Sequence, residues 1–81
     1  MKIEEAFVWI ADVFELDLED ISSEMERDDI EAWDSLGMLS LMARLDEDFE
    51  IMLEEDDLDT LHGVQSIIDL LQRHNKIAEQ A

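Results

Sequence analysis

The middle of the chain, from Ala32 to Phe49, constrains the fold more than any other stretch. Its apolar side chains recur every third or fourth residue, which is the spacing of an amphipathic helix: Met38, Leu41, Met42, Leu45 and Phe49. Leu39 and Ala43 widen this stripe. Asp and Ser favour the N-cap position, so Asp34 or Ser35 is predicted to begin the helix.

Three further segments have helical spacing. Residues 2–15 form an amphipathic first helix, residues 56–61 a short helix with Leu58 and Leu61 turned inward, and residues 64–73 a last helix after Gly63. Residues 16–33 show no sustained period and predict a long loop, with one helical turn near Ser22 to Glu26. Ile51 and Leu53 resemble a short strand that has no partner to pair with.

These elements predict an all-α protein. We expect a small four-helix bundle, made of three main helices and a short third helix, with a long loop between the first and second helices. The 81 residues are enough for one domain with one modest core. We expect a single domain over residues 1–81, with an ordered core at about 2–73 and a frayed C-terminal tail.

The charge of the chain restricts the partners it can have. A net charge of −19 argues against nucleic-acid binding and favours basic protein surfaces, although acidity can also serve solubility alone. No apolar run is long enough to span a membrane, and acidic residues interrupt the N-terminal segment where a signal peptide would be apolar. We therefore expect a soluble, cytoplasmic monomer that binds neither nucleic acid nor membrane.

The sequence offers little for catalysis or metal binding. The absence of cysteine excludes disulfides and thiol chemistry, and neither His62 nor His74 lies in a motif that would activate a serine nucleophile. Asp46, Asp48 and Glu50 alternate like the start of a calcium loop, but Ile51 stands where such a loop needs glycine. We predict that the protein is not an enzyme and has no dedicated metal site.

The motifs of the chain resemble the acyl carrier protein family over roughly residues 2–72. Asp34-Ser35-Leu36 matches the Asp-Ser-Leu signature that opens the second helix of that family. Residues 45–49 with Ile51 resemble the end of that helix, and residues 63–71 resemble the start of the fourth. Four positions depart from the pattern of fatty-acid-synthesis carriers: Trp33, Gly37, Ser40 and Arg44. These departures indicate a discrete, specialised member of the family.

The resemblance implies a covalent 4′-phosphopantetheine arm on the hydroxyl of Ser35, flanked by Asp34 and Leu36. A phosphopantetheinyl transferase would attach the arm from coenzyme A, and the arm would hold acyl, aminoacyl or polyketide intermediates as thioesters. Partners would then include loading ligases and ketosynthase- or acyltransferase-type enzymes, in fatty-acid, polyketide or other secondary metabolism. Met38, Asp46 and Glu47 are the candidate partner-binding residues, although Met38 fits an ordinary core position equally well.

Two other hypotheses remain at the level of sequence. The chain fits an unmodified acidic helical adaptor that docks basic protein surfaces, in which Ser35 has no special role. A calcium-responsive helical module is the more remote alternative. Apolar residues that line a cargo cavity cannot be separated from core residues by sequence, as Leu39, Met42 and Ile67 illustrate.

Overall fold

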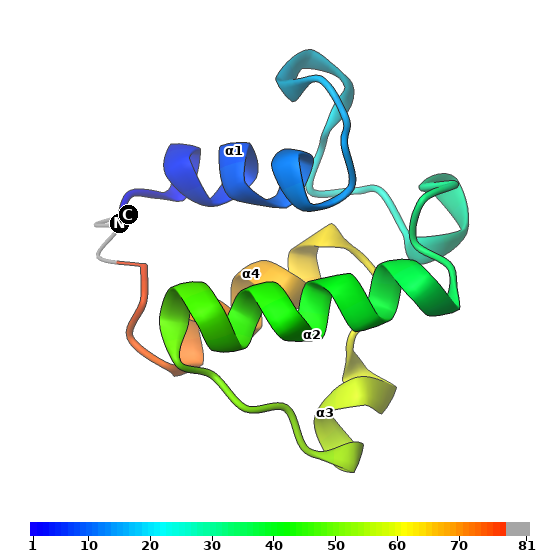
Figure 1. Cartoon of the computed structure of the whole chain (residues 1–81). Helices are drawn as coiled ribbons and strands as arrows, with labels where there is room; N and C mark the ends of the chain where they lie inside the picture. The colour runs from blue at the N-terminus through cyan, green and yellow to red at the C-terminus, as the bar shows by residue number, and fades with distance from the viewer. Residues whose placement is uncertain (78–81) are drawn as a thin grey trace.

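The computed structural model describes residues 1–77 and contains four α-helices (Figure 1). They are α1 (Ile3–Val13), α2 (Ser35–Phe49), α3 (Glu55–Thr60) and α4 (Val64–Arg73), and two short 3-10 turns lie between α1 and α2, at Leu18–Asp20 and Arg27–Asp29. Within the described residues the only β-type pairing is an isolated bridge between Glu26 and Gly63. The prediction of an all-α protein is confirmed.

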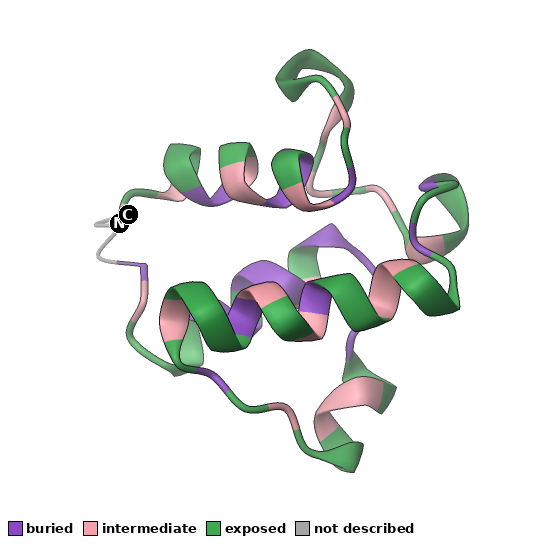
Figure 2. Cartoon of the chain, in the orientation of Figure 1, coloured by how far each residue is buried: buried purple, intermediate pink, exposed green. Residues whose placement is uncertain are grey.

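The apolar faces of α1, α2 and α4 enclose the core. Figure 1 shows α1 beside α2, with α4 behind α2, and α1 contacts both of these helices. Figure 2 shows that the buried residues lie on the sides of the helices that face one another. The core contains these side chains: Ala6, Ile10, Phe14, Ile30, Trp33, Leu41, Leu45, Ile51, Leu61, Val64, Ile67, Ile68, Leu70, Leu71 and Ile77.

The apolar stripe of α2 is narrower than predicted. Leu41 and Leu45 are fully buried, and Met38, Met42 and Phe49 are half-buried, as the spacing indicated. The expectation that Leu39 and Ala43 widen the buried stripe is wrong, because both are exposed. Each residue advances about 100° around an α-helix, so positions two residues from Leu41 point to its opposite side.

The other helices match the predicted segments closely. Helix α4 has the predicted bounds, α1 is shorter than predicted at both ends, and α3 begins and ends one residue early. The predicted helical turn near residues 22–26 forms only as a single hydrogen-bonded turn, in which Met25 N donates to Ser22 O at 3.2 Å, and it does not continue as a helix. The backbone there is used instead for pairing with residues 62–64: Val64 N donates to Met25 O at 2.9 Å, and Arg27 N donates to His62 O at 2.8 Å.

The packed part of the chain extends beyond α4. Asn75 adopts a left-handed conformation with φ 59°, which turns the chain after the helix. Ile77 is then buried against the core, and the ammonium group of Met1 donates to Lys76 O at 3.0 Å. Core contacts therefore continue past residue 73. The remainder of the predicted tail, residues 78–81, lies outside the described residues.

Candidate functional site

Ser35 is the first residue of α2, and its side chain is exposed. Asp34 is the N-cap: its carboxylate oxygen Oδ1 accepts a hydrogen bond from Gly37 N at 2.8 Å, and its carbonyl accepts one from Met38 N at 2.8 Å. The N–H groups of Ser35 and Leu36 make no hydrogen bond with any of residues 1–77. An exposed hydroxyl therefore lies beside two unused amides at a helix N-terminus, an arrangement that suits a phosphate group.

The loop before Ser35 is fixed by a buried anchor at Trp33. The indole of Trp33 stacks on Phe14 with ring centroids 4.9 Å apart and planes at 24°. The carbonyl of Trp33 accepts a hydrogen bond from Arg27 Nε at 3.0 Å. Its indole N–H is buried and has no hydrogen-bond partner within the described residues, so stacking and burial hold the ring. This anchor positions Ser35 two residues later.

Gly37 lies where the backbone of Ala32, in the preceding loop, approaches the first turn of α2. A Cβ atom built on Gly37 would lie 1.9 Å from Ala32 O and 2.9 Å from Ala32 C. No side chain fits there without moving the backbone of the loop. Glycine at this position thus has a steric explanation, which the sequence alone did not reveal.

The other residues predicted for the site do not all gather near Ser35. Leu36 is adjacent to Ser35 and 73% exposed. Met38 is half-buried and packs against the core, which agrees with its interpretation as a core residue. Asp46 and Glu47 are exposed but lie 11 and 12 residues further along the same helix, or about 17 Å at 1.5 Å per residue. They belong to a longer surface, not to the immediate surroundings of the serine.

An exposed apolar surface continues from Ser35 along α2. Leu39 is 59% exposed one turn after Ser35, and Met52, after the helix, is 79% exposed. A groove of about 310 Å³ lies between α2 and the following segment, lined by Leu39, Met42, Ala43, Asp46, Ile51, Met52 and Leu53. This surface was not predicted from the sequence. The spacing of Leu36, Leu39 and Ala43, opposite to Leu41 and Leu45, is the signal that would have found it.

Arg44 connects α2 to α1. It donates to Asp12 Oδ2 at 3.0 Å and to Asp48 Oδ2 at 3.1 Å. Hydrogen bonding to Asp12 is the main cause of a raised pKa of the Arg44 guanidinium; burial acts in the opposite direction, and Asp48 contributes a further increase. The positive charge of Arg44 is thus already paired with two carboxylates at the side of the molecule where α1 and α2 meet.

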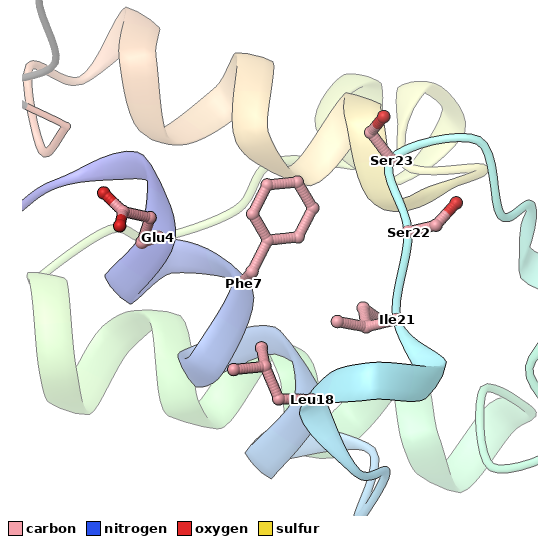
Figure 3. A pocket seen from close by; sticks show the side chains of 6 residues that line it. All are labelled: Glu4, Phe7, Leu18, Ile21, Ser22 and Ser23. Atoms are coloured by element: carbon pink, nitrogen blue, oxygen red, sulfur yellow. The ribbon is translucent and has the colours of Figure 1, made fainter.

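A separate apolar pocket of about 250 Å³ lies between α1 and the loop that follows it (Figure 3). Glu4, Phe7, Leu18, Ile21, Ser22 and Ser23 line it, and Ile21 projects toward Phe7 and Leu18. Neither Ser35 nor any other residue of α2 contributes to this pocket.

A scan against protein-family models, a search of curated proteins and a search of solved structures each found no match. The resemblance to acyl carrier proteins therefore rests on the motifs quoted above. In residues 1–77, no helix combines the length and apolar character that crossing a bilayer requires. Within the same range, no three His, Asp or Glu side chains come together as metal ligands.

Proposed function

We propose that this chain is a discrete carrier protein that bears a 4′-phosphopantetheine arm on Ser35. The observation that carries the proposal is the exposed Ser35 hydroxyl at the start of α2, next to the unbonded amides of Ser35 and Leu36. Those amides and the positive end of the helix dipole favour the phosphodiester that the modification would place there. In this proposal the chain is a carrier-type four-helix bundle, with α3 as its short helix.

The residues around Ser35 fit attachment by a transferase. In the transfer, Ser35 Oγ forms the new phosphoester bond and a base of the transferase takes the hydroxyl proton. The phosphoanhydride bond of coenzyme A breaks, and adenosine 3′,5′-bisphosphate leaves. The side chain of Asp34 is engaged as the N-cap, so it positions the serine rather than activating it. The arm, when bound, supplies the thiol that carries cargo, and partner enzymes supply the catalysis.

The surface beside Ser35 supports a role in presenting cargo to basic partners. Exposed Leu36 and Leu39 provide apolar contacts close to the serine, and exposed Asp46 and Glu47 provide negative charge further along α2. Such a surface suits enzymes that combine an apolar contact with lysine or arginine, and the net charge of −19 accelerates their encounter. Partner specificity would then reside on α2.

Intact-mass analysis after incubation with coenzyme A and a broad-specificity phosphopantetheinyl transferase tests the proposal. We expect one added phosphopantetheine group on the wild type and none on Ser35→Ala. Ser40→Ala is the matched control, because Ser40 is an exposed serine on the same helix, and it should be modified like the wild type. Since the chain has no cysteine, a thiol reagent should also detect one thiol per chain only after modification.

Modification of Ser35→Ala, or loss of modification in Ser40→Ala, would contradict the assignment of Ser35. If the folded wild type stays unmodified, a second transferase of different specificity is the next test. Failure with both would favour the unmodified acidic adaptor.

A further inference from the structure

A second groove lies at the other end of α2 from Ser35, where that helix meets α1. It has a volume of about 510 Å³ and is lined by Met1, Glu5, Val8, Trp9, Asp12, Asp48 and Phe49. Val8 is 51% exposed, although it is a large apolar residue in the middle of a helix. Asp48 follows Ser35 by 13 residues, about 20 Å along the helix axis. The groove is therefore separate from the proposed attachment site.

The apolar floor of the groove is held in a defined geometry. Trp9 Nε1 donates to Asp48 Oδ2 at 2.6 Å, and the indole packs edge-on against Phe49 with centroids 5.0 Å apart. The guanidinium carbon of Arg44 lies 5.8 Å from the centre of the Trp9 ring. A preorganised aromatic surface loses little conformational entropy when it is covered, which favours its use in binding.

The rim of the groove carries more negative than positive charge. Glu5 and Asp12 face it from α1 and Asp48 faces it from α2, while Arg44 and the ammonium group of Met1 supply the positive charges. Both hydrogen bonds to Asp48 reach Oδ2, and its Oδ1 makes none with residues 1–77. Asp12 likewise uses only Oδ2. Carboxylate oxygens on both walls thus remain available to a cationic partner.

We propose that the groove between α1 and the C-terminal half of α2 docks a basic amphipathic helix of a partner protein. An aliphatic side chain of that helix would lie on Val8 and Phe49, and flanking arginine or lysine side chains would reach Asp12 and Asp48. The charge complementarity of an acidic rim to a basic helix selects this occupant over a second copy of the chain, which carries the same net charge of −19. This inference does not depend on modification of Ser35.

Docking there would leave Ser35 accessible. A partner held in this groove could retain the carrier at high effective concentration while another active site reaches the arm at the opposite end of α2. The two surfaces of the helix would thus serve different partners at the same time.

The test is a titration of the isotope-labelled, unmodified protein with a synthetic amphipathic helical peptide that presents leucines on one face and arginines along its flanks. The chain has two tryptophans, and their indole N–H signals act as probe and internal reference. We expect the Trp9 signal to shift on binding and the Trp33 signal, which belongs to a buried ring, to stay in place. A scrambled peptide of identical composition should bind more weakly and leave Trp9 unaffected.

Val8→Ser and Leu18→Ser form a matched pair, since the two side chains are 51% and 54% exposed and neither change alters the charge. We expect Val8→Ser to weaken binding about fivefold, because it removes apolar area from the groove, and Leu18→Ser less than about twofold, because Leu18 does not line the groove. The proposal is overturned by an unmoved Trp9 signal, by equal effects of the two substitutions, or by no binding at millimolar peptide. Failure of this test would leave the modification of Ser35 unaffected.

Discussion

Gly37 shows how one backbone contact can outweigh the intrinsic preference of a residue. Glycine normally weakens a helix, yet here it permits Ala32 O to lie where a Cβ atom would be. The first turn of α2 and the loop before it therefore pack as one unit. Asp34, which caps the same turn, depends on that arrangement because its carboxylate bonds to Gly37 N.

We expect Gly37→Ala to destabilise the protein by about 1–3 kcal/mol, because the added methyl group meets backbone that can move only by displacing the loop. Chemical denaturation measures the difference in the free energy of unfolding. Ser40→Ala in the same helix is the control and should be neutral or slightly stabilising, since alanine is the better helix former. A Gly37→Ala protein as stable as wild type would show that the loop relaxes freely.

At the scale of elements, α1 and α2 are joined on their exposed side by a polar network as well as by the core. Asp48 lies at its centre and accepts hydrogen bonds from Trp9 and from Arg44. The hydrogen bond from Trp9, followed by that from Arg44, holds the pKa of the Asp48 carboxyl below its ordinary value. These contacts are exposed, so we expect them to orient the two helices more than they stabilise the fold.

The lowered pKa of Asp48 gives a pH dependence of definite sign. A carboxyl with a lowered pKa in the folded state contributes its stabilisation above its unfolded pKa, and loses it as the pH falls through the folded value. We expect the Trp9–Asp48 contact to persist at neutral pH and to weaken only below about pH 4. The indole signal of Trp9, followed by NMR during acid titration, reports this step.

Trp9→Phe should raise the pKa of Asp48 toward its ordinary value, because it removes the largest cause of the shift. Trp33→Phe is the control, since it also deletes an indole N–H, but one without a hydrogen-bond partner in residues 1–77. Titration of the Asp48 carboxyl carbon measures both variants. The same pKa in wild type and Trp9→Phe would show that the hydrogen bond does not act on Asp48.

At the scale of the whole molecule, the dominant feature is the net charge of −19. Twenty-four acidic residues against five basic ones lie on a molecule whose Cα radius of gyration is 11.6 Å, so most carboxylates repel several neighbours. Repulsion between exposed charges is screened within about 10 Å at 0.1 M salt. The folded state, being compact, gains more from screening than the expanded unfolded chain does.

We therefore expect the melting temperature to rise by several degrees between about 10 mM and 200 mM salt, because screening relieves this repulsion. Differential scanning calorimetry measures it, and sodium and potassium chloride should act equally if screening is the cause. Divalent cations should stabilise at lower concentrations through their higher charge. A melting temperature that does not change over this range would contradict the hypothesis that repulsion between carboxylates lowers the stability of the folded state.

The periodicity of the sequence determined which segments are helical, and on α2 it identified Leu41 and Leu45 at the centre of the buried face but overestimated the width of that face. The bounds of α2 and α4 followed from spacing and cap chemistry, which are local properties, whereas the choice of Asp34 over Ser35 as the N-cap came from the structure. The turn expected at residues 22–26 stays a single turn because the backbone of Met25 and Arg27 pairs with residues distant in sequence, which no local pattern encodes.

Only the tertiary structure decided which residues near Ser35 share a surface. The exposed hydroxyl of Ser35 was predictable, since a helix start is usually accessible and Asp-Ser is a capping sequence. The approach of Ala32 to Gly37, the groove that Leu39 shares with Met52, and the groove at Trp9 were not predictable from local patterns. Each depends on how two segments of the chain pack against one another, whether they lie far apart in sequence or are joined by a short turn. Packing of this kind is a property of the folded chain as a whole.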